Sequence, residues 1–276
     1  MGRPLHELVI ERPATSIIAT ILVAVWGICA KKGLGYGELG VSFTAVAVQG
    51  QLWRAAVAQV CHVDLLHLAF NVSALWSLGG AEVLLGHAAY TRITTILFVL
   101  ETPILLSMYY GLSRVQFAPG AERYLSQVSV GYSGVLFGWF AVIPTLPPRL
   151  GAQAGAVRLL GLPVPPLAAP FAALVFTSLL VPRASFLGHL AGIVAGFAVG
   201  GCAWVAPWAL TWPVVGAVGS LAGAACVWSW VRERGGRGGV FALFPGGSDS
   251  SSGAAQQVHP GGWNEPEGHV RDAEGV

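Results

Sequence analysis

The stretch GHLAGIVAG, residues 188–196, is apolar apart from one imidazole near its start. Glycines recur in it every fourth position, and Gly200 extends the same stripe. A helix with such a narrow face can approach another helix closely inside a membrane. Hydrocarbon penalises polar groups, so His189 must be buried in protein or face water there. The stretch therefore predicts a membrane-spanning helix that carries a functional side chain.

The composition of the whole chain is that of a polytopic membrane protein. Of its 276 residues, 54% are hydrophobic and 10% are charged, whereas a soluble domain carries about 25% charged residues. The formal net charge is +2, and no basic run interleaved with aromatics appears, which sets nucleic-acid binding aside. The cysteines lack the paired spacing of a disulfide framework or a metal site and are interpreted as small packing residues. They are Cys29, Cys61, Cys202 and Cys226.

Seven apolar segments can be placed, and the expected fold class is therefore all-α. They are residues 14–30, 57–79, 91–111, 131–146, 167–182, 186–206 and 211–231. Several are shorter than the roughly 20 residues that a lone span needs. A short helix persists where protein surrounds it, so the fourth segment is expected inside the bundle. No cleavage site closes the first segment, which is interpreted as a span and not as a signal peptide.

Polar residues inside these segments fall on spans of even number. The second span carries His67 and Asn71, the fourth begins with Ser133, and the sixth carries His189 near its start. Helices of even number enter the membrane from the same side. We therefore expect these side chains to converge at one depth, as in a catalytic site.

Ser133 lies in the stretch GYSG, residues 131–134, at the expected start of a helix. Backbone N–H groups at a helix N-terminus lack intrahelical partners and can stabilise a developing oxyanion. The flanking Gly131 and Gly134 permit a tight turn and a close approach of substrate. Alone, the pattern is weak, because Gly and Ser are also common in helix packing within membranes. If the sixth helix packs on the fourth, His189 can take the Ser133 proton; a hydrogen bond from His189 to a backbone carbonyl is the alternative. No acidic residue is expected at this depth, so the predicted dyad works without a carboxylate.

His67 and Asn71 are four residues apart and so share one helix face. Both can donate hydrogen bonds, and with the Ser133 amide they could form an oxyanion hole; interhelical polar contacts are the alternative. His62 lies about 140° round the same helix from His67, so it is expected to point elsewhere. It is interpreted as a structural link from the loop to the start of the helix. Glu82 is expected in contact with water at the end of the second span, and Glu101 has no assigned role.

The connection between the first two spans is too polar to cross the membrane and too apolar to be fully exposed to water. We expect it to lie half-submerged, with Trp53 as interfacial anchor and Arg54 snorkelling to the surface. The predicted organisation is a core at residues 1–209, an additional helix at 210–231 and a disordered polar tail at 232–276.

Taken together, these residues resemble the signature of the rhomboid intramembrane serine proteases. The matching residues are Trp53-Arg54, His62, His67, Asn71, Gly131, Ser133, Gly134, His189, Gly192 and Gly196, in the family's order. The resemblance covers about residues 10–206 and implies a six-helix core with a dyad of Ser133 and His189. It also implies an oxyanion hole from His67, Asn71 and the Ser133 amide, a half-submerged Trp-Arg loop, and a seventh helix after the core.

The activity implied by the resemblance is cleavage of single-span membrane proteins within or beside their transmembrane segment. No cofactor or metal is implied, and the expected partners are single-pass substrates and membrane lipids. The alternative is a catalytically silent chaperone or trafficking adaptor that binds client helices, and a transporter comes third. The chain is expected in the endomembrane/Golgi system or the plasma membrane. Basic residues at 31–32 and 232–237 conflict with the family's usual orientation, which leaves the orientation open.

Overall fold

The computed structural model describes residues 4–115, 120–146, 157–159, 162–181, 184–205 and 211–235, and these are overwhelmingly helical. The longer elements are α2 (Pro13–Lys32), α5 (Leu65–Leu78), α6 (Gly80–Leu85), α7 (His87–Ser113), α9 (Ser133–Val142), α10 (Ala169–Leu180), α11 (Phe186–Val205) and α12 (Trp212–Gly235). The shorter ones are α1 (Leu5–Glu11), α3 (Tyr36–Leu39), η1 (Thr44–Val48), α4 (Arg54–Val60), α8 (Arg123–Ser126), η2 (Ile143–Thr145), β1 (Val157–Leu159) and β2 (Leu162–Val164).

Five helices in the described part of the chain are long and apolar enough to cross a membrane: Pro13–Lys32, Leu65–Leu85, His87–Ser113, Phe186–Ala203 and Trp212–Glu233. Two shorter apolar helices, Ser133–Thr145 and Ala169–Leu180, complete the seven predicted segments. The predicted all-α, polytopic fold class is confirmed. The last helix continues to Gly235, and residues 236–276, most of the predicted tail, lie outside the described residues.

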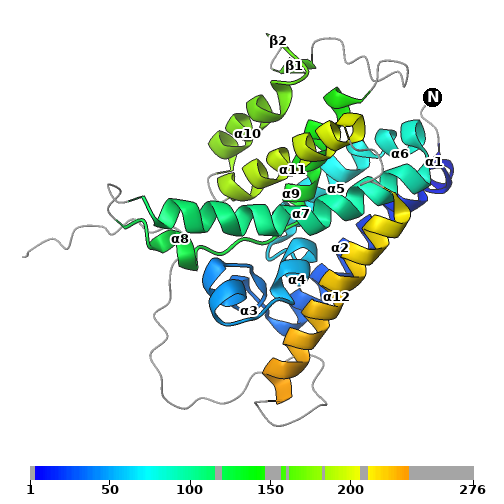
Figure 1. The fold of residues 1–276 in the computed structure, drawn as a ribbon. Coiled ribbons are helices and arrows are strands. Elements are labelled where there is room, and N and C mark those ends of the chain that lie inside the picture. The colour runs from blue at the N-terminus through cyan, green and yellow to red at the C-terminus, as the bar shows by residue number, and fades with distance from the viewer. Residues whose placement is uncertain are drawn as a thin grey trace, which may run out of the picture.

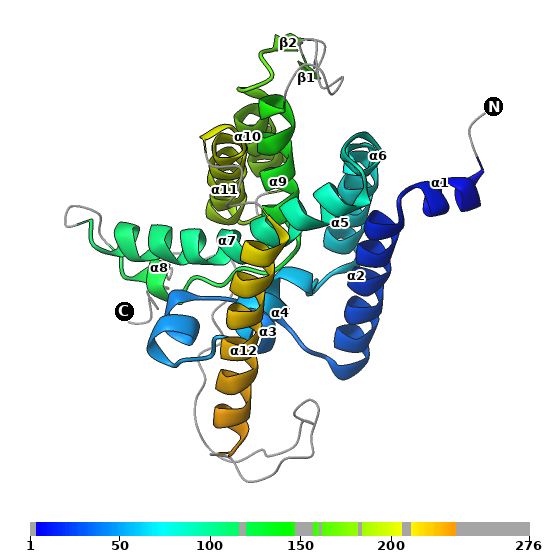
Figure 2. The ribbon, with the colours of Figure 1, turned by 45° about the vertical axis from the view of Figure 1, so that its right-hand side comes forward.

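The short helix α9 lies inside the bundle, where α5, α7, α10 and α11 pack around it. Eight of its ten residues are buried, including Trp139, whose indole stacks on Tyr90 and donates to Thr94 Oγ1 at 3.0 Å. Protein therefore replaces lipid around a helix too short to span alone. In both ribbon views α3 and α4 lie on one side of α7, and α10 and α11 lie on the other (Figures 1 and 2).

The second span begins later than predicted, at Leu65 instead of residue 57. Asp64 ends the preceding loop, and its carboxylate accepts the backbone N–H of His67 at 2.7 Å as an N-cap. The apolar residues before it form a separate helix, α4. The prediction that His62 belongs to the helix was therefore wrong.

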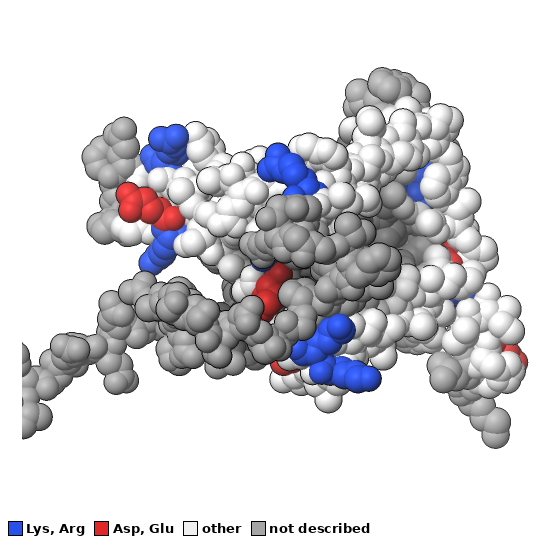
Figure 3. Space-filling model, turned by 90° about the horizontal axis from the view of Figure 1, so that it is seen from below, with Lys and Arg blue, Asp and Glu red and all other residues white. Residues whose placement is uncertain are grey.

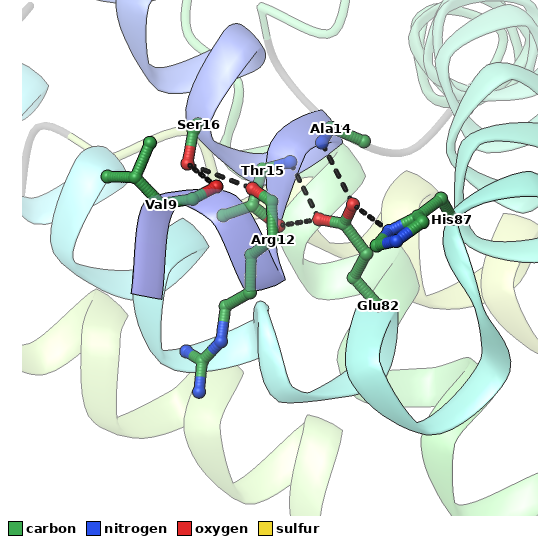
Figure 4. Close-up of polar contacts among 7 residues, drawn as sticks. All are labelled: Val9, Arg12, Ala14, Thr15, Ser16, Glu82 and His87. Atoms are coloured by element: carbon green, nitrogen blue, oxygen red, sulfur yellow. Dashed lines mark hydrogen bonds and ion pairs between the residues drawn. The ribbon is translucent and has the colours of Figure 1, made fainter. Parts of the chain in front are cut away.

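Glu82 joins the second span to the first, and the expectation that water reaches it was wrong, because it is 0% exposed. Its carboxylate accepts the backbone N–H groups of Ala14 and Thr15, both at 2.8 Å, and the Thr15 hydroxyl at 2.7 Å. The fourth contact is His87 Nδ1 at 2.8 Å (Figure 4). These donors include N–H groups of the first turn of α2, so Glu82 caps that helix from α6.

A two-stranded antiparallel hairpin, β1 with β2, follows the fourth helix and leaves the fold class unchanged. It lies at the end of the molecule away from α3 and α4 (Figures 1 and 2). Seen from below, Lys, Arg, Asp and Glu side chains lie at several separate places among uncharged ones (Figure 3).

Candidate active site

The turn before α9 positions Ser133 as the first residue of that helix. Gly131 has a φ of 113°, a backbone conformation that L side chains rarely adopt. A β-carbon there would also lie 2.7 Å from the imidazole of His67. The Gly131 N–H donates to the carbonyl of Ala58 in α4 at 2.8 Å, which fixes the turn to the preceding loop.

Ser133 and His189 are in hydrogen-bond contact, although 56 positions separate them: the Ser133 Oγ to His189 Nε2 distance is 2.9 Å. The imidazole is 4% exposed and stacks on Phe137, with ring centroids 4.2 Å apart and 19° between the planes. Phe137 lies one turn after Ser133, so α9 supplies both the hydroxyl and the ring that supports the imidazole. His189 Nδ1 has no hydrogen-bond partner within the described residues.

Two more of the predicted side chains lie around this turn. His67 is half-buried beside Gly131, and His62 is 1% exposed with its ring 5.0 Å from that of His67 in an edge-to-face arrangement. His62 therefore does not point away, because the helical geometry behind that prediction does not apply before Leu65. Burial, with a smaller effect from His67, lowers the pKa of His62 from 6.5 to about 4, which keeps this imidazole neutral at physiological pH.

Asn71, also predicted for the oxyanion hole, is 4% exposed and donates from Nδ2 to the carbonyl of His67 at 2.9 Å. Its Oδ1 has no partner within the described residues. The structure thus brings His67 next to the Ser133 turn. Asn71 lies one helical turn after His67 along α5. The Asn71 Nδ2 group carries a second N–H that the bond to His67 does not use, and this N–H can donate to a substrate oxygen.

A pocket of about 10 Å³, lined by both apolar and polar residues, lies beside Ser133 and has room for about one water molecule. Its polar lining consists of Gln59, Glu101, Ser129, Ser133 and Ser185. Glu101 is 6% exposed, accepts the Thr102 hydroxyl at 3.1 Å, and packs so closely on Gly134 that a β-carbon there would lie 2.7 Å from its carboxyl oxygen. The expectation that no acidic residue reaches the depth of Ser133 was therefore wrong.

Glycines of α9 and α11 allow these two helices to approach closely, which brings Ser133 and His189 together. A β-carbon on Gly192 would overlap the carbonyl of Gly134, and one on Gly196 would overlap the carbonyl of Gly138. Backbone thus packs directly on backbone, as predicted for the small-residue stripe.

Trp53 and Arg54 make contacts that differ from the predicted ones. Trp53 Nε1 donates to Glu233 Oε2 of α12 at 2.8 Å. Arg54 Nη1 donates to the carbonyls of Gly37 and Gly40, at 2.8 and 2.9 Å, and its Cζ lies 5.0 Å from the centroid of the Trp53 ring. Burial lowers the pKa of Arg54, against the raising effect of nearby Glu233. Trp53 therefore joins this segment to α12, and Arg54 joins it to the backbone of residues 37–40.

Sequence reasoning missed Phe137, Glu101 and Glu233. Phe137 could have been found from its spacing of four from Ser133, and the buried carboxylate Glu101 from its place within an apolar span. The described residues contain no group of three or more His, Cys, Asp or Glu side chains arranged to hold a metal ion.

Comparison of the sequence with known proteins gives the family of the chain. A family model described as the Rhomboid domain matches residues 49–206. The chain belongs to the rhomboid family, and it is an integral, multi-pass membrane protein.

Similar proteins come from animals, plants and fungi. Rhomboid-related protein 4 of Homo sapiens is 33% identical over 144 residues, which are 52% of this chain and 43% of that protein. Rhomboid-like protein 15 of Arabidopsis thaliana is 26% identical over 185 residues, 66% of this chain and 45% of that protein. Rhomboid-type serine protease 2 of Saccharomyces cerevisiae is 27% identical over 150 residues, 54% of this chain and 53% of that protein. The chain spans about half the length of the curated relatives it matches.

Proposed function

We propose that this chain is an intramembrane serine endopeptidase that cleaves single-pass membrane proteins within or next to their transmembrane segment. The observation that carries the proposal is the 2.9 Å contact between Ser133 Oγ and His189 Nε2. A hydroxyl hydrogen-bonded to an imidazole is the arrangement that activates a serine nucleophile. The similarity to Rhomboid-type serine protease 2 of Saccharomyces cerevisiae supports the proposal.

The reaction follows from the positions of these groups. Ser133 Oγ attacks the scissile carbonyl carbon, and its proton passes to the lone pair of His189 Nε2. The negative oxygen that develops faces the N-terminus of α9, where the Ser133 N–H and the neighbouring His67 can donate to it. His189 then returns the proton to the amine of the leaving fragment. A water molecule deprotonated by His189 hydrolyses the acyl-serine ester and regenerates both side chains.

Labelling by a fluorophosphonate probe tests the nucleophile before any substrate is known. We expect covalent labelling of the folded wild type and none of Ser133→Ala. The matched control is Ser107→Ala, on the exposed side of α7, which should label as the wild type does. Labelling that survives Ser133→Ala would refute the assignment.

Co-expression with a panel of single-span proteins tests the substrate class. Cleavage should depend on both Ser133 and His189, and both variants should accumulate to wild-type levels. If clients bind but neither labelling nor cleavage occurs, the chain is the non-enzymatic adaptor that its fold would also allow.

A further inference from the structure

The helix α12, which follows the matched rhomboid domain, makes polar contacts with the loop that carries Trp53 and Arg54. Glu233 is the centre of these contacts: its Oε2 accepts Trp53 Nε1 at 2.8 Å and its Oε1 accepts Gln51 Nε2 at 3.0 Å. One carboxylate near the end of the last helix thus holds two side chains more than 170 positions away. Charge-assisted hydrogen bonds of this kind are among the stronger ones in proteins.

The backbone of the same loop is held one turn earlier along α12. Ser229 is 1% exposed, accepts the backbone N–H of Trp53 at 3.1 Å, and donates to the carbonyl of Cys226 at 2.9 Å. The thiol of Cys226 in turn donates to the carbonyl of Leu52 at 3.2 Å. Residues 51–53 therefore contact α12 through both side chains and backbone.

Gln51 extends this network to Arg54. Its Oε1 accepts Arg54 Nε at 2.5 Å while its Nε2 donates to Glu233. Arg54 then binds the carbonyls of Gly37 and Gly40, on the far side of the loop. The positive guanidinium and the negative carboxylate of Glu233 thus lie on either side of one amide, an electrostatically favourable arrangement at a partly buried position.

The anchored segment leads directly to the turn that positions Ser133. It is continuous with α4, whose Ala58 carbonyl accepts the Gly131 N–H at 2.8 Å. A second link lies nearby, where Val41 and Ser129 exchange two backbone hydrogen bonds of 2.9 Å. The backbone before Ser133 therefore depends on this loop for its position.

We propose that α12 anchors the loop segment 49–54 through Glu233 and Ser229, and that Glu233 is thereby a positioning residue for Ser133. Loss of the anchor releases the loop and, through α4, the Gly131 turn. Ser133 then spends less time in hydrogen-bond contact with His189. The catalytic consequence rests on the proposed function, whereas the anchoring itself does not.

Hydrogen exchange of the full-length protein in lipid nanodiscs tests the anchoring without a substrate. We expect Glu233→Ala and Trp53→Phe each to speed amide exchange across residues 49–60 by about tenfold, because each removes a charge-assisted hydrogen bond. The double variant should exchange no faster than the faster single variant. Unchanged exchange in Glu233→Ala would overturn the proposal.

Two matched serines on α12 separate the anchor from a general effect on the helix. Ser229→Ala should speed exchange of the same segment, whereas Ser220→Ala, at an exposed position of the helix, should leave it as in the wild type. An equal effect of the two substitutions would overturn the specific contact.

Cleavage kinetics test the positioning role. Glu233→Ala should lower kcat about five- to tenfold with a smaller change in KM, and Glu233→Gln, which keeps one acceptor, should be intermediate. Faster loop exchange with wild-type kcat would overturn the positioning of Ser133. If the wild type neither cleaves nor labels with the fluorophosphonate, the proposed function fails, and the exchange result still decides the anchoring.

Discussion

Gly192 of α11 packs directly on the carbonyl group of Gly134 in α9, leaving no space for a β-carbon between the two helices. Gly134 is the residue after Ser133, and Gly192 lies three residues after His189. The contact therefore sets the separation of the two helices at the level of the dyad. Backbone-to-backbone packing of this kind is stiff, because no side chain can adjust its rotamer to take up a change.

Gly192→Ala should consequently separate α9 from α11 and abolish labelling at Ser133. The methyl group must displace backbone, at a cost of about 1–3 kcal/mol. The control is Gly201→Ala on the same helix, where a β-carbon meets nothing within 4 Å. Probe labelling and thermal unfolding in detergent measure the two effects. Wild-type labelling of Gly192→Ala would show that the helices can adjust.

The sequence was sufficient to predict the fold class, the seven apolar segments and the close approach at the glycine stripe. These features depend on local composition and on spacing within one helix. The start of the second span was misplaced because an apolar run cannot distinguish a short loop helix from the beginning of a span. Asp64 was the overlooked signal, since an acidic residue three positions before His67 is a typical N-cap.

Phe137 stacks on His189, and Phe137→Leu should impair catalysis more than folding. Aromatic stacking contributes about 1 kcal/mol beyond the burial of the ring, so we expect kcat to fall roughly three- to tenfold. The matched control is Phe70→Leu on α5, whose side chain is 54% exposed. Cleavage of the best substrate found by co-expression gives the comparison. A similar loss in both variants would mean that stacking on the imidazole contributes nothing specific.

The contacts of Trp53 could not be predicted from the sequence for a physical reason. Their partner Glu233 lies 180 positions away on a helix whose packing is set by the tertiary fold, so no periodicity connects the two residues. The Trp-Arg pair alone equally suits an interfacial anchor, because both residue types favour the headgroup region.

Glu82→Gln should destabilise the protein without changing the contact between Ser133 and His189. The carboxylate accepts from Ala14, Thr15 and His87, and an amide cannot accept at both of its ends. We expect a loss of about 2 kcal/mol in the free energy of unfolding, from an unpaired donor at the start of α2. Denaturant titration measures it, with Glu7→Gln on the exposed side of α1 as control. Equal midpoints for the two variants would contradict the capping role.

The buried His62 makes stability depend on pH. Its pKa is lowered from 6.5 to about 4 in the folded protein, first by burial and then by the neighbouring His67. Between these two values the unfolded chain binds a proton that the folded chain does not, so stability rises with pH across this window. The stabilisation is complete above pH 6.5 and is lost as the pH falls toward 4, with an upper limit of about 3 kcal/mol.

His62→Gln should therefore flatten the profile of thermal unfolding against pH between 4 and 6.5, because glutamine does not titrate. The exposed His6 is the matched control, and His6→Gln should retain the wild-type slope. The difference between the two variants isolates His62 from the other histidines and from Asp64, which titrate in both. Parallel profiles for the two variants would mean that the proton uptake on acid unfolding occurs elsewhere in the chain.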